Sequence, residues 1–496
     1  MSKPFIQINK ADNVVVALRN LKAETTLDIN GQNVTLQQDV ARGHKVAITA
    51  IEQDSDIIKY GFPIGHATQP IEAGDHIHTH NLKTNLSGEL CYEYHPKLNS
   101  LNAKLSEKTF NGFRRKTGDI GVRNELWIVP TVGCVNGVAQ QMVRRLEQTI
   151  DTSHIDAINV MTHNFGCSQL GDDHENTRRI LADIVLHPNA GGVLVLGLGC
   201  ENNQPEQFKE LLTEADQGRI RYLVTQDVED EIEEGTQLLL QLAQQMKEDK
   251  REVCPISDLK IGLKCGASDG LSGITANPLL GEFSDFIVQN GGTTILTEVP
   301  EMFGAETVLM ERAKDKQVFD DTVDMVNRFK KYFLNHNQPV YENPSPGNKA
   351  GGISTLEDKS LGCIQKGGAA TIEAVLDYGD RLQQKGLNLL YGPGNDLVSS
   401  TAMGSAGCQM VLFTTGKGTP FGSFVPTVKI STNSEIYNQK KKWIDFNAGA
   451  LVEDTSMEVL LEQFIDFILS VASGELVNNE KSEIREIAIF KSGVTL

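Results

Sequence analysis

The sequence lacks any apolar run that could span a bilayer. No stretch approaches the roughly 20 apolar residues of a transmembrane helix, and residues 1–10 lack the apolar core of a signal peptide. Cysteine is sparse: 8 residues in 496 are too few and too dispersed for a disulfide framework. We therefore expect a cytoplasmic protein without membrane contact, whose cysteines are free thiols, metal ligands or catalytic groups.

Basic side chains are in the minority. The sequence has 46 Lys and Arg and 65 Asp and Glu, which gives a formal net charge of −19. This negative charge repels a phosphate backbone and argues against nucleic-acid binding. The glycine-rich segment 416–422 fits neither the Walker pattern nor the dinucleotide fingerprint. A His-Glu-x-x-His helix is also missing. These absences argue against a nucleotide cofactor and a zinc protease.

The pattern of apolar, polar and turn-forming residues along the chain predicts an α/β protein with a small all-β N-terminal domain. Residues 1–82 read as short extended runs broken by Gly and Asp, and residues 83–113 as a polar linker. Residues 114–255 alternate strands with helices, and so do residues 256–496. The apolar runs in both segments are continuous and β-branched, which predicts parallel sheets covered on both faces.

Four cysteines stand just beyond predicted strands and beside a glycine: Cys134, Cys167, Cys200 and Cys265. Ligands of open α/β sheets bind outside the carboxyl ends of the strands, so the pattern predicts an active edge. We expect Cys167 and Cys200 to contact substrate and Cys265 to bind a metal. Alternatively, each cysteine is a small residue that fills a turn. The thiolates could also bind iron singly or share an iron–sulfur cluster, although their spacing is wider than in ferredoxin-like motifs.

The histidines suggest proton transfer or metal binding. His76, His78 and His80 recur at a period of two, so on a strand all three project from one face. That face could bind a metal or a carboxylate, or it could belong to an exposed edge strand without a role. His44 is a candidate general base or a turn residue.

Oxygen ligands, amides and an ammonium follow other predicted strands. Asp269 and Glu298 are candidate metal ligands, although a helix-capping role competes for Asp269 and for Glu301. The loop 343–349 offers Asn348 and Lys349, which we expect to bind substrate.

Several of these motifs, in this order, resemble the altronate and galactarate dehydratase family over nearly the whole chain. The motifs are Gly166-Cys167 with Asp172-Asp173-His174, Gly197-Leu198-Gly199-Cys200-Glu201, Ser268-Asp269-Gly270 with Thr275-Ala276-Asn277-Pro278, the loop 343–349, and Gly418-Thr419-Pro420. The resemblance implies a β-clip, SAF-like N-terminal domain, a middle domain used in homodimerisation, and a Rossmann-like C-terminal domain with a metal site. It also implies activity that depends on Fe²⁺ or Mn²⁺.

Within that family, His76-x-His78-x-His80-Asn81 resembles the altronate branch, which implies that D-altronate is dehydrated to 2-dehydro-3-deoxy-D-gluconate and water. Our hypothesis from the residues is that Cys265, Asp269 and Glu298 hold the metal. An imidazole of the N-terminal domain, His78 first, then His44, with His76 beside them, acts as acid or base. Alternatives are another sugar acid such as galactarate, a sulfo-lyase acting on a sulfonated hydroxy acid, and a sugar-acid sensor without enzymatic activity.

Overall fold

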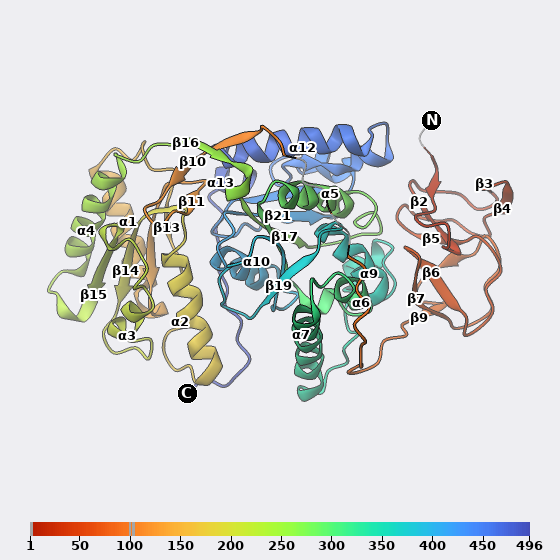
Figure 1. The fold of residues 1–496 in the computed structure, drawn as a ribbon, viewed down its shortest axis with the longest axis horizontal. Coiled ribbons are helices and arrows are strands. Elements are labelled where there is room, and N and C mark those ends of the chain that lie inside the picture. The colour runs from red at the N-terminus through yellow and green to blue at the C-terminus, as the bar shows by residue number, and fades with distance from the viewer. Residues whose placement is uncertain (1–2, 99–100, 102–104) are drawn as a thin grey trace.

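The computed structural model describes residues 3–98, 101 and 105–496 and arranges them in three parts (Figure 1). A β domain lies at one end, a small α/β unit lies at the other, and a larger α/β unit fills the centre. Among the helices of the described residues, none combines the length and apolarity needed to cross a membrane.

The N-terminal part is built only of short strands. They are β1 Phe5–Ile6, β2 Val14–Ala17, β3 Thr26–Ile29, β4 Gln32–Thr35, β5 Lys45–Ala47, β6 Asp56–Lys59, β7 Phe62–Ala67, β8 His76–Ile77 and β9 Leu82–Lys83. They form antiparallel sheets in the orders β1-β2-β5-β8, β3-β4 and β6-β7-β9. Alternation in β3, where Leu27 and Ile29 are buried and their neighbours exposed, is typical of a sheet with one solvated face. The predicted small all-β domain is confirmed.

The middle part contains a four-stranded parallel sheet in the order β13-β12-β14-β15. Its elements are β10 Thr109–Arg114, β11 Ile120–Gly121, β12 Glu125–Pro130, α1 Asn136–Thr149, β13 Ile158–Val160, α2 Gly171–Val185, β14 Ala190–Gly197, α3 Pro205–Glu210, β15 Ile220–Val224, α4 Glu231–Met246 and β16 Glu252–Pro255. Successive residues of β12 face opposite cores: Leu126 packs with α1 and α4, and Trp127 packs with α2. Helices therefore cover both faces.

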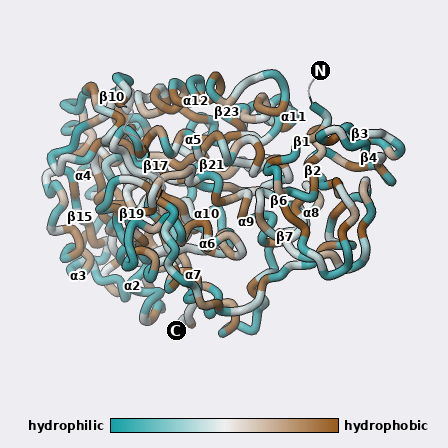
Figure 2. The backbone as a smooth tube through the Cα atoms, turned by 45° about the vertical axis from the view of Figure 1, so that its right-hand side comes forward, coloured by the Kyte–Doolittle hydropathy of each residue, from teal (hydrophilic) through white to brown (hydrophobic). Residues whose placement is uncertain are grey.

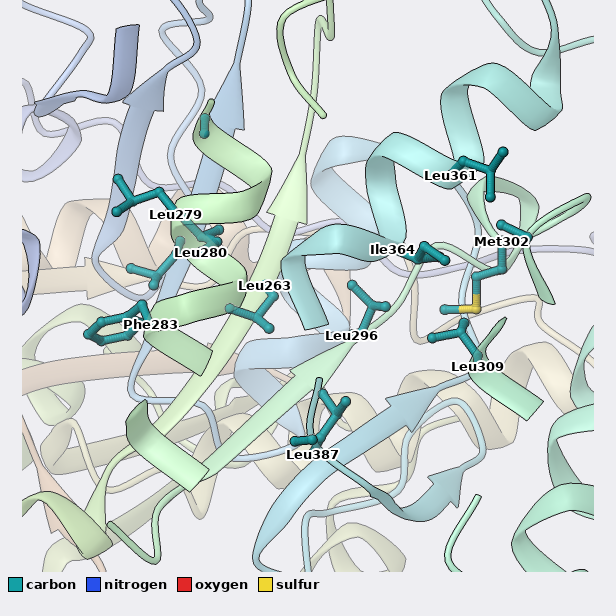
Figure 3. Packing of buried hydrophobic residues seen from close by; sticks show 14 of the residues in the cluster. Leu263, Leu279, Leu280, Phe283, Leu296, Met302, Leu309, Leu361, Ile364 and Leu387 are labelled. Atoms are coloured by element: carbon teal, nitrogen blue, oxygen red, sulfur yellow. The ribbon is translucent and has the colours of Figure 1, made fainter. Parts of the chain in front are cut away.

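The C-terminal part surrounds a seven-stranded parallel sheet in the order β19-β20-β18-β17-β21-β22-β23. Its elements are β17 Lys260–Cys265, α5 Ala276–Gln289, β18 Thr293–Leu296, α6 Glu306–Met310, α7 Lys316–Asn335, α8 Pro346–Ala350, α9 Leu356–Cys363, β19 Ile372–Leu376, β20 Gly386–Leu390, α10 Asp396–Ser405, β21 Met410–Thr415, β22 Thr427–Ser431, α11 Ser434–Gln439, β23 Phe446–Asn447, α12 Met457–Ala472 and α13 Asn478–Lys481. Figure 3 shows Leu263 of β17 and Leu296 of β18 among the side chains of the core, beside α5 and α9. The predicted fold class is confirmed.

The segment between the first two parts runs along the C-terminal part. Tyr92 donates its hydroxyl to Glu306 at 2.6 Å, and the backbone N–H of Lys97 donates to Glu311 at 2.7 Å. Strand β10 begins at Thr109, inside the range 83–113 that the sequence suggested as a linker, and pairs with β16.

A buried charge triad joins the β domain to the C-terminal part. The carboxylate of Asp358 in α9 accepts from Lys45 of β5 and from Lys59 of β6, both at 2.8 Å. All three side chains are almost completely buried. Figure 2 shows strands β6 and β7 beside α9, where this contact lies. The triad fixes the histidine-bearing domain against the larger sheet.

Candidate active site

Two thiols and a carboxylate meet at the carboxyl edge of the seven-stranded sheet. Cys265 ends β17, Glu301 ends the 3₁₀ turn that follows β18, and Cys363 ends α9. The sulfur of Cys265 lies 3.1 Å from Oε2 of Glu301 and 3.3 Å from the sulfur of Cys363, which itself lies 3.3 Å from Glu301. Within the described residues they are the one set of three potential metal ligands whose ligand atoms lie within 4.8 Å of one another. Strand β17 adjoins the point where strand order reverses, the usual ligand position in such sheets.

Two ammonium groups stabilise negative charge in this cluster. Lys366 donates to the sulfur of Cys265 at 2.9 Å, and Lys359 lies 2.7 Å from Glu301. Burial disfavours the Glu301 carboxylate, but Lys359 and Lys366 outweigh it and lower the pKa of Glu301 to about 2. The hydrogen bond with Cys363 lowers the pKa of Cys265 to about 7, whereas the same bond and burial raise the pKa of Cys363 well above its ordinary value. The cluster therefore offers a carboxylate and one readily formed thiolate.

Glu298, an expected metal ligand, makes an ion pair. Its Oε1 lies 2.5 Å from Nζ of Lys264, which also lies 2.9 Å from Asp396. Burial and the charge of Glu301 raise the pKa of Glu298, while the ammonium of Lys264 acts in the opposite direction. Its backbone adopts φ 69°, a left-handed conformation that is uncommon for a residue with a side chain. Glu298 lies one turn before the cluster.

Asp269, the other expected carboxylate ligand, is held by hydroxyl and amide donors. Ser272 donates to one carboxylate oxygen at 3.1 Å, as does the backbone N–H of Leu271, and Thr432 donates to the other at 2.9 Å. Burial raises the pKa of Asp269, while these donors act in the opposite direction. The side chain therefore organises the loop after β17, close to the capping role that the sequence left open.

A cavity of about 670 Å³ opens beside the cluster. Its lining includes Cys265, Glu301 and Lys359, together with Asn348 and Lys349, two expected substrate contacts. Asn348 is buried in α8: its Oδ1 accepts from Ser345, and its Nδ2 donates to the backbone carbonyl of Ser268 at 2.9 Å. The Asn348 amide thus shapes the wall, and the Lys349 side chain belongs to its lining.

The histidines of the β domain meet one another at the face that contacts the C-terminal part. Nδ1 of His44 lies 2.9 Å from Nε2 of His76, and the ring centroids of His76 and His80 are 5.6 Å apart. His78 places Nδ1 2.8 Å from the hydroxyl of Ser354. Burial, followed by the nearby Lys45, lowers the pKa of His78 to about 4, and burial with neighbouring imidazoles lowers that of His76 to about 3. The imidazoles of His76 and His78 are therefore neutral at pH 7 and available as proton acceptors.

Cys167 and Cys200 lie elsewhere. Both are exposed in loops of the middle part, and neither belongs to the lining of the cavity beside Cys265. The sequence pattern groups them with Cys265 because all three follow predicted strands. The strands belong to two different sheets, so the structure forms two separate edges.

Sequence reasoning missed Cys363, Lys359 and Lys366. It placed Glu301 in a segment that offers oxygen ligands, but it favoured Glu298 as the ligand and left Glu301 with a competing role as a helix cap. One signal was available, because Gly362-Cys363 repeats the glycine–cysteine pairing that singled out the other cysteines. The lysines carry no such signal. Their role comes from α9 and the turn after it, whose contact with Cys265 is made only in the folded chain.

Three regions of the chain match known domain families. Residues 3–85 match the altronate/galactarate dehydratase SAF domain, residues 112–247 match the second domain of D-galactarate dehydratase/altronate hydrolase, and residues 256–495 match the C-terminal domain of D-galactarate/altronate dehydratase.

Curated proteins are similar over their full length. The chain is 58% identical over 496 residues to an altronate dehydratase of Bacillus subtilis (strain 168), covering 100% of both. It is 56% identical over 493 residues to an altronate dehydratase of Escherichia coli (strain K12), covering 99% of this chain and 100% of that one. A galactarate dehydratase (L-threo-forming) of Escherichia coli (strain K12) is 34% identical over 505 residues, 95% of this chain and 93% of the relative. The chain therefore belongs to the altronate and galactarate dehydratase family.

Proposed function

We propose that the protein is a metal-dependent hydro-lyase that dehydrates D-altronate to 2-dehydro-3-deoxy-D-gluconate and water. One structural observation carries the proposal: the buried Cys265–Glu301–Cys363 cluster opens into a cavity lined by Lys349 and Lys359. A sugar acid needs a cation or ammonium for its carboxylate and a polar wall for its hydroxyls. The similarity to altronate dehydratases over the full length favours altronate over galactarate.

We propose Cys265, Glu301 and Cys363 as the ligands of Fe²⁺, with Mn²⁺ as the alternative. Two sulfurs and one carboxylate are a softer donor set than the all-oxygen sites that Mg²⁺ and Ca²⁺ prefer, and they suit Fe²⁺ better than Mn²⁺. Cys265 is retained from the sequence hypothesis, while Glu298 and Asp269 already have other partners. A bound cation would supply a Lewis acid for the substrate carboxylate and the adjacent hydroxyl.

The residues around the cluster have separate tasks in this proposal. Lys349 binds the substrate carboxylate from the cavity wall, and Asn348 holds that wall in place through Ser268. His78, whose Nδ1 lies 2.8 Å from the hydroxyl of Ser354 at the interface, accepts the proton alpha to the carboxylate. His44, whose ring centroid lies 5.1 Å from that of His78, is the second candidate. The buried Asp358 triad keeps these imidazoles in position relative to α8 and α9.

We also propose that the chain works as a cytoplasmic homodimer, with residues 1–82 as the SAF-like domain, 83–113 as the linker, 114–255 as the dimerising domain and 256–496 as the catalytic domain. The support is the family resemblance and the order of the three matched regions. Light scattering on the full-length protein measures the number of chains directly. A monomer at micromolar concentration would contradict the dimer.

The test is anaerobic turnover by protein that has been stripped of metal and then reloaded with Fe²⁺ or Mn²⁺. We expect 2-dehydro-3-deoxy-D-gluconate from D-altronate only after reloading. Product from galactarate alone, or sulfite from sulfolactate, would show that the protein is a lyase with a different substrate. Tight binding of altronate without any product would favour the sugar-acid sensor.

A further inference from the structure

Three further cysteines form a regular series in the middle part, away from the cavity. Cys134, Cys167 and Cys200 follow β12, β13 and β14, and each is preceded by glycine. The positions 134, 167 and 200 are evenly spaced along the chain. The three strands are neighbours in one parallel sheet, so the three cysteines lie at the same carboxyl edge.

Backbone hydrogen bonds join the three loops. The N–H of Gly133 donates to the carbonyl of Phe165 at 2.9 Å, which joins the Cys134 loop to the Cys167 loop. The N–H of Asn203 donates to Gly166 at 3.0 Å, and its side-chain amide donates to the carbonyl of Thr131 at 3.1 Å. Asn203 is fully buried and therefore fastens the Cys200 loop to both of the others.

The glycines before the cysteines permit this close contact. A Cβ at Gly133 would lie 2.6 Å from the carbonyl oxygen of His163, and one at Gly166 would lie 2.1 Å from that of Thr131. Gly166 has φ +98°, and Gly199 has φ +126°, conformations that strain any residue with a side chain. The three glycine–cysteine pairs thus belong to one group of closely packed loops and not to three independent turns.

The cysteine side chains do not fill space in this structure. Cys134, Cys167 and Cys200 are all exposed, whereas Cys254 and Cys408 are buried. A cysteine that serves as a small apolar residue is buried, so packing does not explain the three exposed thiols. Helices α1 and α2 begin shortly after Cys134 and Cys167, and their N-terminal ends favour negatively charged groups at the same edge.

We propose that Cys134, Cys167 and Cys200 form a three-thiolate site that binds an iron–sulfur cluster. Sulfurs bound to one ion at about 2.3 Å are at most about 4.6 Å apart. The only described group of three ligands within 4.8 Å is the one at Cys265, so the three thiols are too widely spread for a single ion. A cluster suits them because each cysteine binds a different iron. With three protein thiolates, one iron of a [4Fe–4S] cluster takes its fourth ligand from outside these loops.

The test is anaerobic reconstitution of the full-length protein with a mixture of Fe²⁺, Fe³⁺ and sulfide, followed by iron and acid-labile sulfide analysis and visible absorption. We expect about 4 sulfide per chain in the wild type, and about 5 iron once the Fe²⁺ proposed at Cys265 is added to the 4 of the cluster. The triple variant Cys134→Ser, Cys167→Ser, Cys200→Ser should lose the sulfide and the visible band. Cys91→Ser, another exposed cysteine, and Cys363→Ser, in the other thiol site, should keep both.

Circular dichroism and thermal unfolding of the triple variant check that it folds, which we expect because the three side chains are exposed. The readout is independent of turnover, so it stands even where altronate dehydration fails. Failure of the wild type to take up sulfide, or equal uptake by the triple variant, would overturn the proposal. Loss of the cluster in Cys363→Ser with retention in the triple variant would also overturn it and place the cluster at Cys265.

Discussion

The sulfur of Cys363 lies 3.3 Å from the sulfur of Cys265, although 98 residues separate them along the chain. Cys265 ends a central strand and Cys363 ends a helix that is buried throughout. Glu301 closes the group from the neighbouring strand end. The contact therefore requires the sheet, the turn after β18 and α9 to be assembled together, and any metal affinity of this group depends on the folded C-terminal part.

The ligand assignment can be tested with two neighbouring glutamates. Glu301→Gln removes a carboxylate from the cluster, so we expect Fe²⁺ affinity to fall by at least about 100-fold, the upper end of losses seen for supporting residues. Glu298→Gln is the matched control, because it changes a buried glutamate that pairs with Lys264. Anaerobic competition with a chelator measures both. Loss of Fe²⁺ from Glu298→Gln alone would return the ligand role to Glu298.

The proton-transfer assignment separates metal binding from turnover. His78→Ala should lower the turnover number by about 10² to 10⁴-fold while Fe²⁺ affinity stays unchanged, because His78 lies outside the thiol cluster. His44→Ala is the second variant, and the exposed His95→Ala is the control. Steady-state kinetics on iron-loaded protein provide the measurement. Wild-type turnover in both the His78 and His44 variants would exclude the imidazoles as acid or base.

Features that depend on the local sequence could be predicted, whereas features that depend on contacts between distant residues could not. The parallel sheets were predictable because continuous β-branched runs such as that of β14 are buried on both faces. Cys265 was predictable for the same reason, since it ends such a run. Helix α9 was not, because Glu357, Asp358 and Lys359 read as a solvated face while all three are buried. Each of these side chains pairs with a residue far away along the chain. No local periodicity in a single sequence indicates such a pairing.

Neutralising the central carboxylate of the interdomain triad should destabilise the protein strongly. Asp358→Asn leaves the ammonium groups of Lys45 and Lys59 buried without their counter-charge, and breaking a buried pair costs about 3–5 kcal/mol. The control Asp39→Asn removes an exposed partner of Lys22 and should leave stability unchanged. Urea unfolding monitored by circular dichroism compares them. Equal stability of the two variants would mean that the triad does not hold the domains together.

The same triad predicts how stability depends on pH. One carboxylate faces two ammonium groups, and burial together with repulsion from Lys59 lowers the pKa of Lys45 from 10.5 to about 8. Between these values the unfolded chain binds the proton that the folded chain has released, so the free energy of unfolding rises with pH, by up to about 1.4 kcal/mol per pH unit. At acidic pH the lowered pKa of Asp358 affects the stability. The stabilisation of the folded chain by this carboxylate is lost as the pH falls below the ordinary aspartate pKa.

Lys45→Met isolates the alkaline effect, because it removes the titrating group and keeps an unbranched side chain of similar length. Wild-type protein should gain stability between pH 8 and pH 10.5, and the variant should gain less by roughly 3 kcal/mol, the free energy of a shift from 10.5 to about 8. Urea unfolding at fixed ionic strength across this range measures the difference. Parallel curves for the two proteins would show that Lys45 is charged in the folded state up to its ordinary pKa, and that Asp358 compensates both lysines fully.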